Sequence, residues 1–110
     1  KVLPCKTIIV HNAFSANEDG RNDHFQIENI EDNDCYKNIR VEVFNRWGVL
    51  VFERDHYNND DIVFRGISEG RVTVEKSQEL PAGTYFYILK YRDSNSNAFE
   101  KSGYLYLNRK

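Results

Sequence analysis

The sequence predicts an all-β fold, an immunoglobulin-like antiparallel β-sandwich of about seven strands in a single domain that spans residues 1–110. Three observations lead to this prediction. Runs of β-branched and aromatic residues recur along the chain, turn-forming residues separate them, and helical periodicity is almost absent. A length of 110 residues suits one hydrophobic core rather than two.

The predicted strands follow one another along the chain. The first is the β-branched run T-I-I-V-H at residues 7–11, and the second is F-Q-I-E-N-I at 25–30, where apolar and polar side chains alternate. The segments N-I-R-V-E-V-F-N and W-G-V-L-V-F-E then form a hairpin, which Gly48 closes because glycine readily takes a positive φ. Further strands are predicted at 61–66, 71–75, 84–92 and 98–107.

The strand at 84–92 carries an aromatic ladder. Tyr85, Tyr87, Leu89 and Tyr91 share one face, and Phe86 and Ile88 lie on the other. Exposed tyrosines on a sheet bind flat sugar rings or another protein, whereas buried ones cover a core with their hydroxyls at its edge. The first possibility gives an alternative function, an adhesive or carbohydrate-binding immunoglobulin-like module that uses Tyr85, Tyr87 and Tyr91.

Composition excludes several classes of partner. The net charge is −2, with 15 basic and 17 acidic residues, so the chain offers little to nucleic acid phosphates. No apolar run reaches the roughly 18–20 residues that span a bilayer, so direct membrane insertion is not expected. The start K-V-L-P-C-K lacks the apolar centre of a signal peptide and resembles strand sequence, which suggests a fragment of a longer secreted or cell-surface protein.

The two cysteines, Cys5 and Cys35, allow one disulfide. Closing a loop of about 30 residues would stabilise the fold by roughly 3–4 kcal/mol and would indicate an oxidising compartment. The alternative is two separate buried thiols. The three histidines show no ligand spacing with either cysteine, so zinc is not expected.

Enzyme chemistry finds no support in the sequence. The serines lie in no nucleophile-elbow context, no glycine-rich loop joins a strand to a helix, and no cofactor is expected. The loop at 15–24 contains N-x-D-G, as in an EF-hand, but an EF-hand alignment puts Ser15 and Gln26 at positions that need carboxylates. An irregular site built from Asp19, Asn22 and Asp23 is the alternative to a rigid, self-capped loop without metal. The expected structural loop residues are Asn17, Asp19, Gly20, Asn22 and Asp23.

Four ordered motifs together resemble one known family. They are N-A-F-S-A-N-E-D-G-R-N-D-H-F (12–25), V-F-N-R-W-G-V-L-V-F-E (43–53), L-P-A-G-T-Y-F-Y-I-L (80–89) and K-S-G-Y-L-Y-L-N-R (101–109). This series resembles the gliding-motility-associated C-terminal domain, the type B sorting domain of the Bacteroidetes type IX secretion system. Ala16 and Glu18 replace the usual Pro and Gly, F-R-G replaces W-x-G, and the segment 68–79 is longer and more charged than in the family pattern.

The resemblance implies a non-catalytic secretion signal. Such domains take a large cargo, for example a gliding adhesin of the SprB type, across the outer membrane to the cell surface. Their implied partners are type IX translocon components and a SprF/PorP-like outer-membrane protein.

Two surfaces are predicted to bind these partners. One is the turn at Arg46, Trp47 and Gly48, because Trp and Arg are enriched at binding hot spots, although Trp47 could instead fold back over the core. The other is the terminal strand, where an edge could accept or donate a β-strand. Its residues are Tyr104, Leu105, Tyr106, Leu107, Asn108, Arg109 and Lys110.

Overall fold

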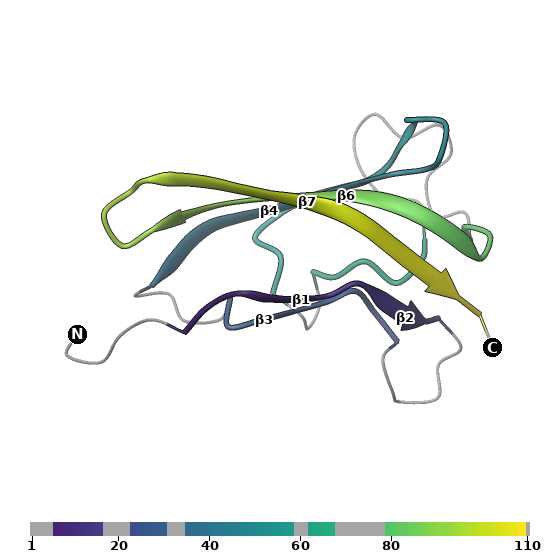
Figure 1. The fold of residues 1–110 in the computed structure, drawn as a ribbon, viewed down its shortest axis with the longest axis horizontal. Helices are drawn as coiled ribbons and strands as arrows, with labels where there is room; N and C mark the ends of the chain where they lie inside the picture. The colour runs from purple at the N-terminus through teal and green to yellow at the C-terminus, as the bar shows by residue number, and fades with distance from the viewer. Residues whose placement is uncertain (1–5, 17–22, 31–34, 59–61, 68–78, 110) are drawn as a thin grey trace.

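A computed structural model describes residues 6–16, 23–30, 35–58, 62–67 and 79–109. Within these ranges the chain is all-β, with seven strands in two sheets and no helix (Figure 1). The strands are β1 (Ile9–His11), β2 (Ala13–Ser15), β3 (Gln26–Glu28), β4 (Tyr36–Phe44), β5 (Leu50–Asp55), β6 (Gly83–Asp93) and β7 (Ala98–Asn108).

The larger sheet has the strand order β2-β7-β6-β4-β5. Two long hairpins, β4–β5 and β6–β7, supply four of its strands, and β4 pairs antiparallel with β6 to join them. The β6–β7 register runs from Gly83↔Leu107 to Arg92↔Ala98 without a shift. This continuous register fixes which backbone groups of β7 face β6 along its whole length.

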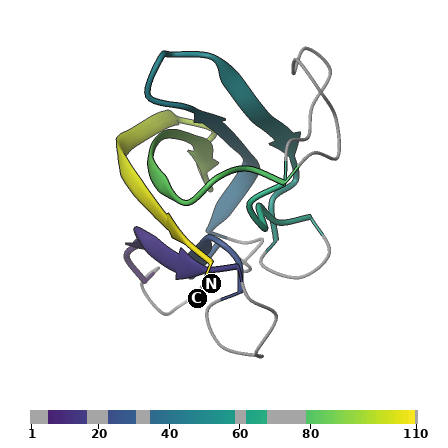
Figure 2. The same ribbon diagram turned by 90° about the vertical axis from the view of Figure 1, so that its right-hand side faces the viewer.

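The smaller sheet consists of β1 and β3, paired antiparallel. Only Asn12 separates β1 from β2, so one extended segment belongs to the small sheet in its first part and to the large sheet in its second. β2 runs parallel to the end of β7, and the Tyr106 N–H donates to the Asn12 carbonyl at 2.8 Å. Figure 2 shows this end of β7 (yellow) beside β2 (purple). The segment therefore connects the two sheets along one side.

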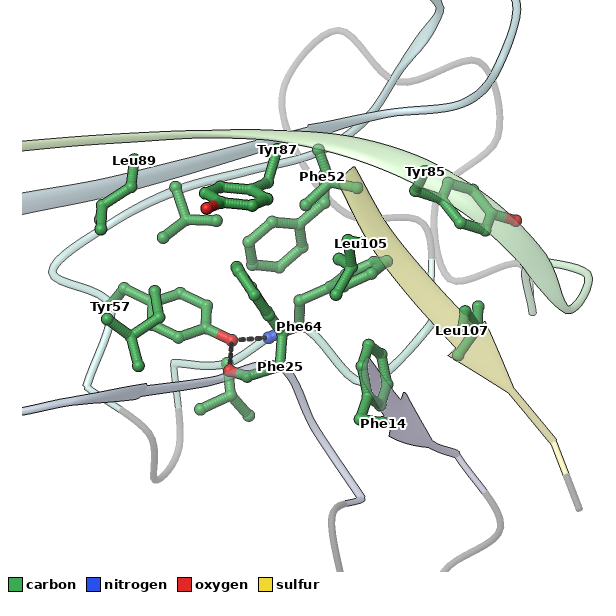
Figure 3. Close-up of a cluster of buried hydrophobic side chains, with 14 of the residues drawn as sticks. Phe14, Phe25, Phe52, Tyr57, Phe64, Tyr85, Tyr87, Leu89, Leu105 and Leu107 are labelled. Carbon is green, nitrogen blue, oxygen red and sulfur yellow. Dashed lines mark hydrogen bonds between the residues drawn. The ribbon is translucent and has the colours of Figure 1, made fainter. Parts of the chain in front are cut away.

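The core lies between the two sheets and is closed by the segment around Tyr57 and Phe64 (Figure 3). The Phe52 and Phe64 rings are 5.0 Å apart, and Phe14 meets Phe64 edge-on at 5.7 Å. The Tyr57 hydroxyl donates to the Phe25 carbonyl and accepts the Phe64 N–H. Burial raises the pKa of this hydroxyl well above the usual tyrosine range. One tyrosine thus satisfies two backbone groups inside an aromatic core.

Several predictions need correction. The sheet is mixed rather than wholly antiparallel, because β2 pairs parallel with β7, and the immunoglobulin-like topology stays a prediction. The strand expected at 61–66 is absent over 62–66, where Val63 and Phe64 are both buried instead of alternating. Only Ile67 forms a bridge, to Glu79. The strand expected at 71–75 lies outside the described residues.

The predicted disulfide is described on one side only. Cys35 is buried immediately before β4 and is in disulfide-bonded form. Its expected partner, Cys5, lies outside the described residues, so the pairing between them stays a prediction.

Candidate functional site

The turn between β4 and β5 is held by its asparagine and its glycine. The Asn45 side-chain oxygen accepts the N–H groups of Trp47 and Val49, both at 3.0 Å. The Asn45 carbonyl accepts the Gly48 N–H at 2.9 Å, and Gly48 has φ +80°. This is a three-residue hairpin loop that ends in the left-handed conformation, for which glycine is the favoured residue.

The side chains of Arg46 and Trp47 contribute none of those hydrogen bonds. Trp47 is 74% exposed, and the Arg46 guanidinium lies over its ring, 4.6 Å from the centroid. This stacking is a cation–π contact, which keeps both side chains together on the surface. Trp47 therefore does not fold back over the core, and the choice between core and surface is settled in favour of the surface.

A second loop shows that this turn geometry does not require Arg and Trp. Between β6 and β7, the Asp93 carboxylate accepts the N–H groups of Asn95 and Asn97, both at 2.9 Å. The Asp93 carbonyl accepts the Ser96 N–H, and Ser96 has φ +64°. In this loop, Ser94 and Asn95 stand where the first loop has Arg46 and Trp47. The bulky pair is thus an addition to the turn rather than a condition for it.

An apolar hollow of about 510 Å³ adjoins the Arg46–Trp47 turn on the outer face of the large sheet. Phe86 and Tyr104 stand opposite each other on β6 and β7, with their rings 6.0 Å apart and edge to face. Both are exposed, and Tyr104 is 62% accessible. The hollow brings together the two surfaces that the sequence suggested separately. Its lining includes Phe44, Arg46, Gly48, Phe86, Ile88 and Tyr104.

The same turn borders a second hollow, on the side of the L-P-A-G segment. Trp47 and Pro81 both line it, and the Tyr85 hydroxyl donates to the Pro81 carbonyl at 2.6 Å. Burial raises the pKa of Tyr85, and the positive charges of Arg109 and Arg46 oppose this rise. Two of the recognised sequence motifs, F-N-R-W-G and L-P-A-G-T-Y, therefore meet at one end of the sheet.

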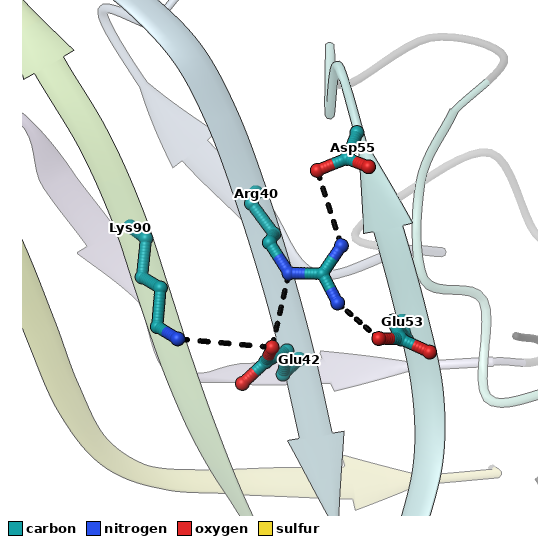
Figure 4. Close-up of polar contacts among 5 residues, drawn as sticks. All are labelled: Arg40, Glu42, Glu53, Asp55 and Lys90. Carbon is teal, nitrogen blue, oxygen red and sulfur yellow. Dashed lines mark hydrogen bonds and ion pairs between the residues drawn. The ribbon is translucent and has the colours of Figure 1, made fainter. Parts of the chain in front are cut away.

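The other half of the outer face is charged (Figure 4). Arg40 contacts Glu42, Glu53 and Asp55, and Lys90 lies 3.9 Å from Glu42. Hydrogen bonds to Asp55 and Glu42 raise the pKa of Arg40 despite the opposing effect of burial. These groups lie on β4, β5 and β6 and form ion pairs with one another, two cations with three carboxylates. The apolar hollow is consequently bounded along the sheet by a self-paired polar network.

The terminal strand divides between core and surface. Leu105 and Leu107 are buried, whereas Tyr104 and Tyr106 are exposed. β7 is not an edge strand at its end, because β2 covers Tyr106 to Asn108. The expectation of a free edge at 104–110 is therefore wrong over 106–108, and Lys110 lies outside the described residues.

Arg109 is committed to the chain itself. Its guanidinium donates to the Leu80 carbonyl at 2.7 Å and to the Gly66 carbonyl at 2.6 Å, with a longer bond of 3.5 Å to the Ala16 carbonyl. These three acceptors belong to three separate segments of sequence. The geometry gives Arg109 a structural part that the sequence did not predict.

The aromatic ladder of β6 points inward. Tyr85 is 5% and Tyr87 7% exposed, and Tyr91 is half-buried, stacked on Phe99 and edge-on to Tyr36. The period-two assignment of faces is confirmed, since Phe86 lies on the exposed side. A flat sugar would need open tyrosine rings, so this burial counts against the carbohydrate-binding alternative.

The predicted loop lies mostly beyond what the structure describes. Asn17, Asp19, Gly20 and Asn22 fall outside the described residues, and Asp23 is half-buried. In the described ranges, no three His, Cys, Asp or Glu side chains gather where they could hold a metal ion. The same ranges contain no helix long and apolar enough to cross a membrane.

An exposed Arg–Trp turn beside an apolar hollow on a β scaffold is an arrangement typical of surfaces that bind another protein. The family model described as the CHU_C Type IX secretion signal domain matches residues 8–107, nearly the whole chain. The chain belongs to this family, and the resemblance seen in its motifs is confirmed. The comparison with curated proteins found no match. The family is non-catalytic, and its members direct secretion across the outer membrane to the cell surface.

Proposed function

We propose that this domain carries its cargo, a large surface adhesin, through the type IX machinery by docking to a SprF/PorP-like outer-membrane protein. The docking surface consists of the Arg46–Trp47 turn and the apolar hollow beside it. The observation that carries the proposal is the comparison of the two hairpin loops: the same pattern of turn hydrogen bonds is built once with Arg46 and Trp47 and once with Ser94 and Asn95.

The energetic argument concerns exposed apolar surface. Trp47 leaves most of its ring in water, and Phe86 and Tyr104 are also exposed nearby. Covering such surface contributes about 25 cal/mol for each Å² removed from water, and Trp and Arg dominate many interfaces. Arg46 already lies over the indole, so part of the side-chain ordering that binding requires is present in the free domain.

The decisive experiment exchanges the two loops. The domain is fused to an exported fluorescent protein in a host that has a type IX system, and surface fluorescence is measured. The wild-type fusion is expected at the cell surface. The double variant Arg46→Ser/Trp47→Asn, which copies the residues of the β6–β7 loop, is expected to fold normally and remain in the periplasm.

A matched control changes Ser94→Ala and Asn95→Ala, which occupy the same places in the opposite hairpin, and should leave export unchanged. Direct binding is measured with a purified SprF/PorP-like protein in detergent, following the fluorescence of Trp47, the chain's only tryptophan. Normal export of the Arg46→Ser/Trp47→Asn variant would show that the turn is not part of the docking surface. A wild-type fusion that stays folded in the periplasm would overturn the proposed function itself.

A further inference from the structure

The first part of β7 has an edge that no described strand covers. β2 is three residues long and pairs only with Tyr106, Leu107 and Asn108. β6 lies on the other side of β7 along its whole length. From Ala98 to Tyr104, therefore, β7 has a neighbour on one side only among the described residues.

Hydrogen bonding at the end of β7 shows which backbone groups face this edge. The Tyr106 N–H donates to the Asn12 carbonyl, and the Asn108 carbonyl accepts the Ala16 N–H, so even-numbered residues face away from β6. In an antiparallel pair this orientation alternates residue by residue, and the β6–β7 register has no shift. The N–H and C=O groups of Glu100, Ser102 and Tyr104 accordingly point away from β6, in the plane of the sheet, toward the open edge.

Accessibility agrees with this assignment. Residues Ala98 to Ser102 and Tyr104 are all exposed, and Gly103 is half-buried. A row of backbone groups of this length that no described strand pairs with is a template for an added strand. No proline interrupts it.

We propose that Ala98–Tyr104 of β7 accepts an extended strand from a partner protein, one with apolar residues on either side of a carboxylate that faces Lys101. This inference rests on the proposed function and adds a second contact, made by the backbone. Tyr104 belongs to both contacts, because its side chain lines the apolar hollow and its backbone faces the open edge.

Charge determines the chemistry of this strand. The register places Glu100 opposite Lys90, whereas Lys101 stands opposite Leu89. Among the described residues, no carboxylate forms an ion pair with Lys101. Beside it, Phe99 is 46% exposed, and the Tyr87 ring lies over Gly103, where an added Cβ would be 3.2 Å from it, so aromatic side chains flank Lys101 on this face. The matching strand has an acidic residue opposite Lys101 and an apolar residue two positions away on either side. Polar residues occupy the positions between them.

The same charge disfavours a second copy of the chain as the occupant. Two copies that paired along the whole open edge, Ala98–Tyr104 against itself, would place Lys101 opposite Lys101. Like charges directly opposite each other destabilise a strand pair, and lysine on an edge is a common protection against self-association.

The test uses the intact domain, labelled for NMR, and a synthetic peptide, acetyl-TVTETVT-amide. In the free domain, the amides of Glu100, Ser102 and Tyr104 should exchange with solvent at least tenfold faster than those of Lys101 and Gly103. Adding the peptide should shift resonances of Ala98–Tyr104 and slow the exchange of those three amides. The peptide acetyl-TVTKTVT-amide should bind at least tenfold more weakly.

Ser102→Pro removes one outward N–H without removing a bond to β6, and it should abolish binding, while Ser102→Ala should leave it unchanged. If Ser102→Pro does not fold, the exchange rates of the wild-type domain still decide. The inference is overturned if the Ser102 amide exchanges as slowly as that of Gly103, or if both peptides bind equally. A dimer that Ser102→Pro dissociates would overturn it in favour of a second copy. None of these measurements depends on export. A negative result would therefore overturn the added-strand proposal without changing the outcome of the fusion experiment that tests the proposed function.

Discussion

Asp93 holds the β6–β7 loop with the same two hydrogen bonds that Asn45 makes in the β4–β5 loop. Each side-chain oxygen accepts the N–H groups two and four residues later. Each loop also ends in a residue of positive φ, Gly48 in one and Ser96 in the other. Besides the Arg46–Trp47 pair, the loops differ at two further positions. The first residue is neutral in one loop (Asn45) and charged in the other (Asp93), and the fourth is Gly48 in one and Ser96 in the other. Each of these two differences is expected to have a measurable effect on stability.

Replacing Ser96 with glycine should stabilise the domain. A non-glycine residue in the left-handed region costs roughly 1–2 kcal/mol, part of which the greater entropy of glycine in the unfolded chain cancels. We expect Ser96→Gly to raise the free energy of unfolding in urea by about 0.5–1 kcal/mol. The reciprocal change Gly48→Ser should lower it by a similar amount, and equal stabilities for Ser96→Gly and wild type would contradict the strain assigned to this loop.

Asp93 should make stability depend on pH at the acid end. Accepting the Asn97 N–H lowers the pKa of this carboxyl below its usual value. Its stabilising effect is therefore full above the unfolded-state pKa and is lost as the pH falls through the lower, folded-state pKa. Asp93→Asn keeps an accepting oxygen, as Asn45 does, but does not titrate. Urea unfolding at about pH 7, 4 and 2.5 should show wild type losing stability relative to Asp93→Asn towards acid; a difference that is constant with pH would refute this.

Removing the Arg109 side chain should destabilise the fold. Its guanidinium joins Leu80, Gly66 and Ala16 through their carbonyls, and hydrogen bonds to a charged group are worth roughly 1.5–3 kcal/mol each before entropy and solvent exposure reduce their sum. We expect Arg109→Ala to cost about 2–3 kcal/mol in urea unfolding. Arg92→Ala, which removes an exposed arginine with one bond to the Ser96 carbonyl, is the control and should cost about 0.5 kcal/mol. Equal losses of stability in the two variants would show that the three hydrogen bonds of Arg109 do not hold these segments together.

Removing the Tyr57 hydroxyl should lower the free energy of unfolding by more than the loss of an exposed hydroxyl does. Tyr57→Phe leaves the Phe64 N–H and the Phe25 carbonyl buried without a partner, at a cost of about 1–3 kcal/mol. The exposed Tyr106→Phe is the matched control and should change stability by less than about 0.5 kcal/mol. In an alkaline absorbance titration, one tyrosine should ionise only as the domain unfolds, and Tyr57→Phe should remove that step.

The sequence was most informative where one rule acted locally. Alternation along β6 correctly separated Tyr85 and Tyr87 from Phe86, and the glycine of the hairpin was placed by turn chemistry. Alternation could not say which face was the core, because both faces carry aromatic residues. The outward position of Trp47 was equally undetermined from sequence, since a turn allows either direction.

Non-local contacts account for what was missed. β2 has only three residues, Ala13–Ser15, too few for a pattern, and it forms because Tyr106 to Asn108 lie beside it. The run around Val63 and Phe64 has strand composition, yet its backbone bonds to the Tyr57 hydroxyl and to Phe25 rather than to a strand. Arg109 was predicted only as one of the partner-binding residues of the terminal strand, because its three acceptors are distant in sequence.

The parallel pairing of β2 with β7 has a mechanical consequence for a domain that travels with a cargo. A pull on the chain before β2 and after β7 acts on the two strands in opposite directions along their lengths. The hydrogen bonds from Tyr106 to Asn12 and from Ala16 to Asn108 would then be loaded together, in shear, whereas a hairpin pulled at its two ends opens one bond at a time. The join between the first and last strands is therefore oriented to resist tension along the chain.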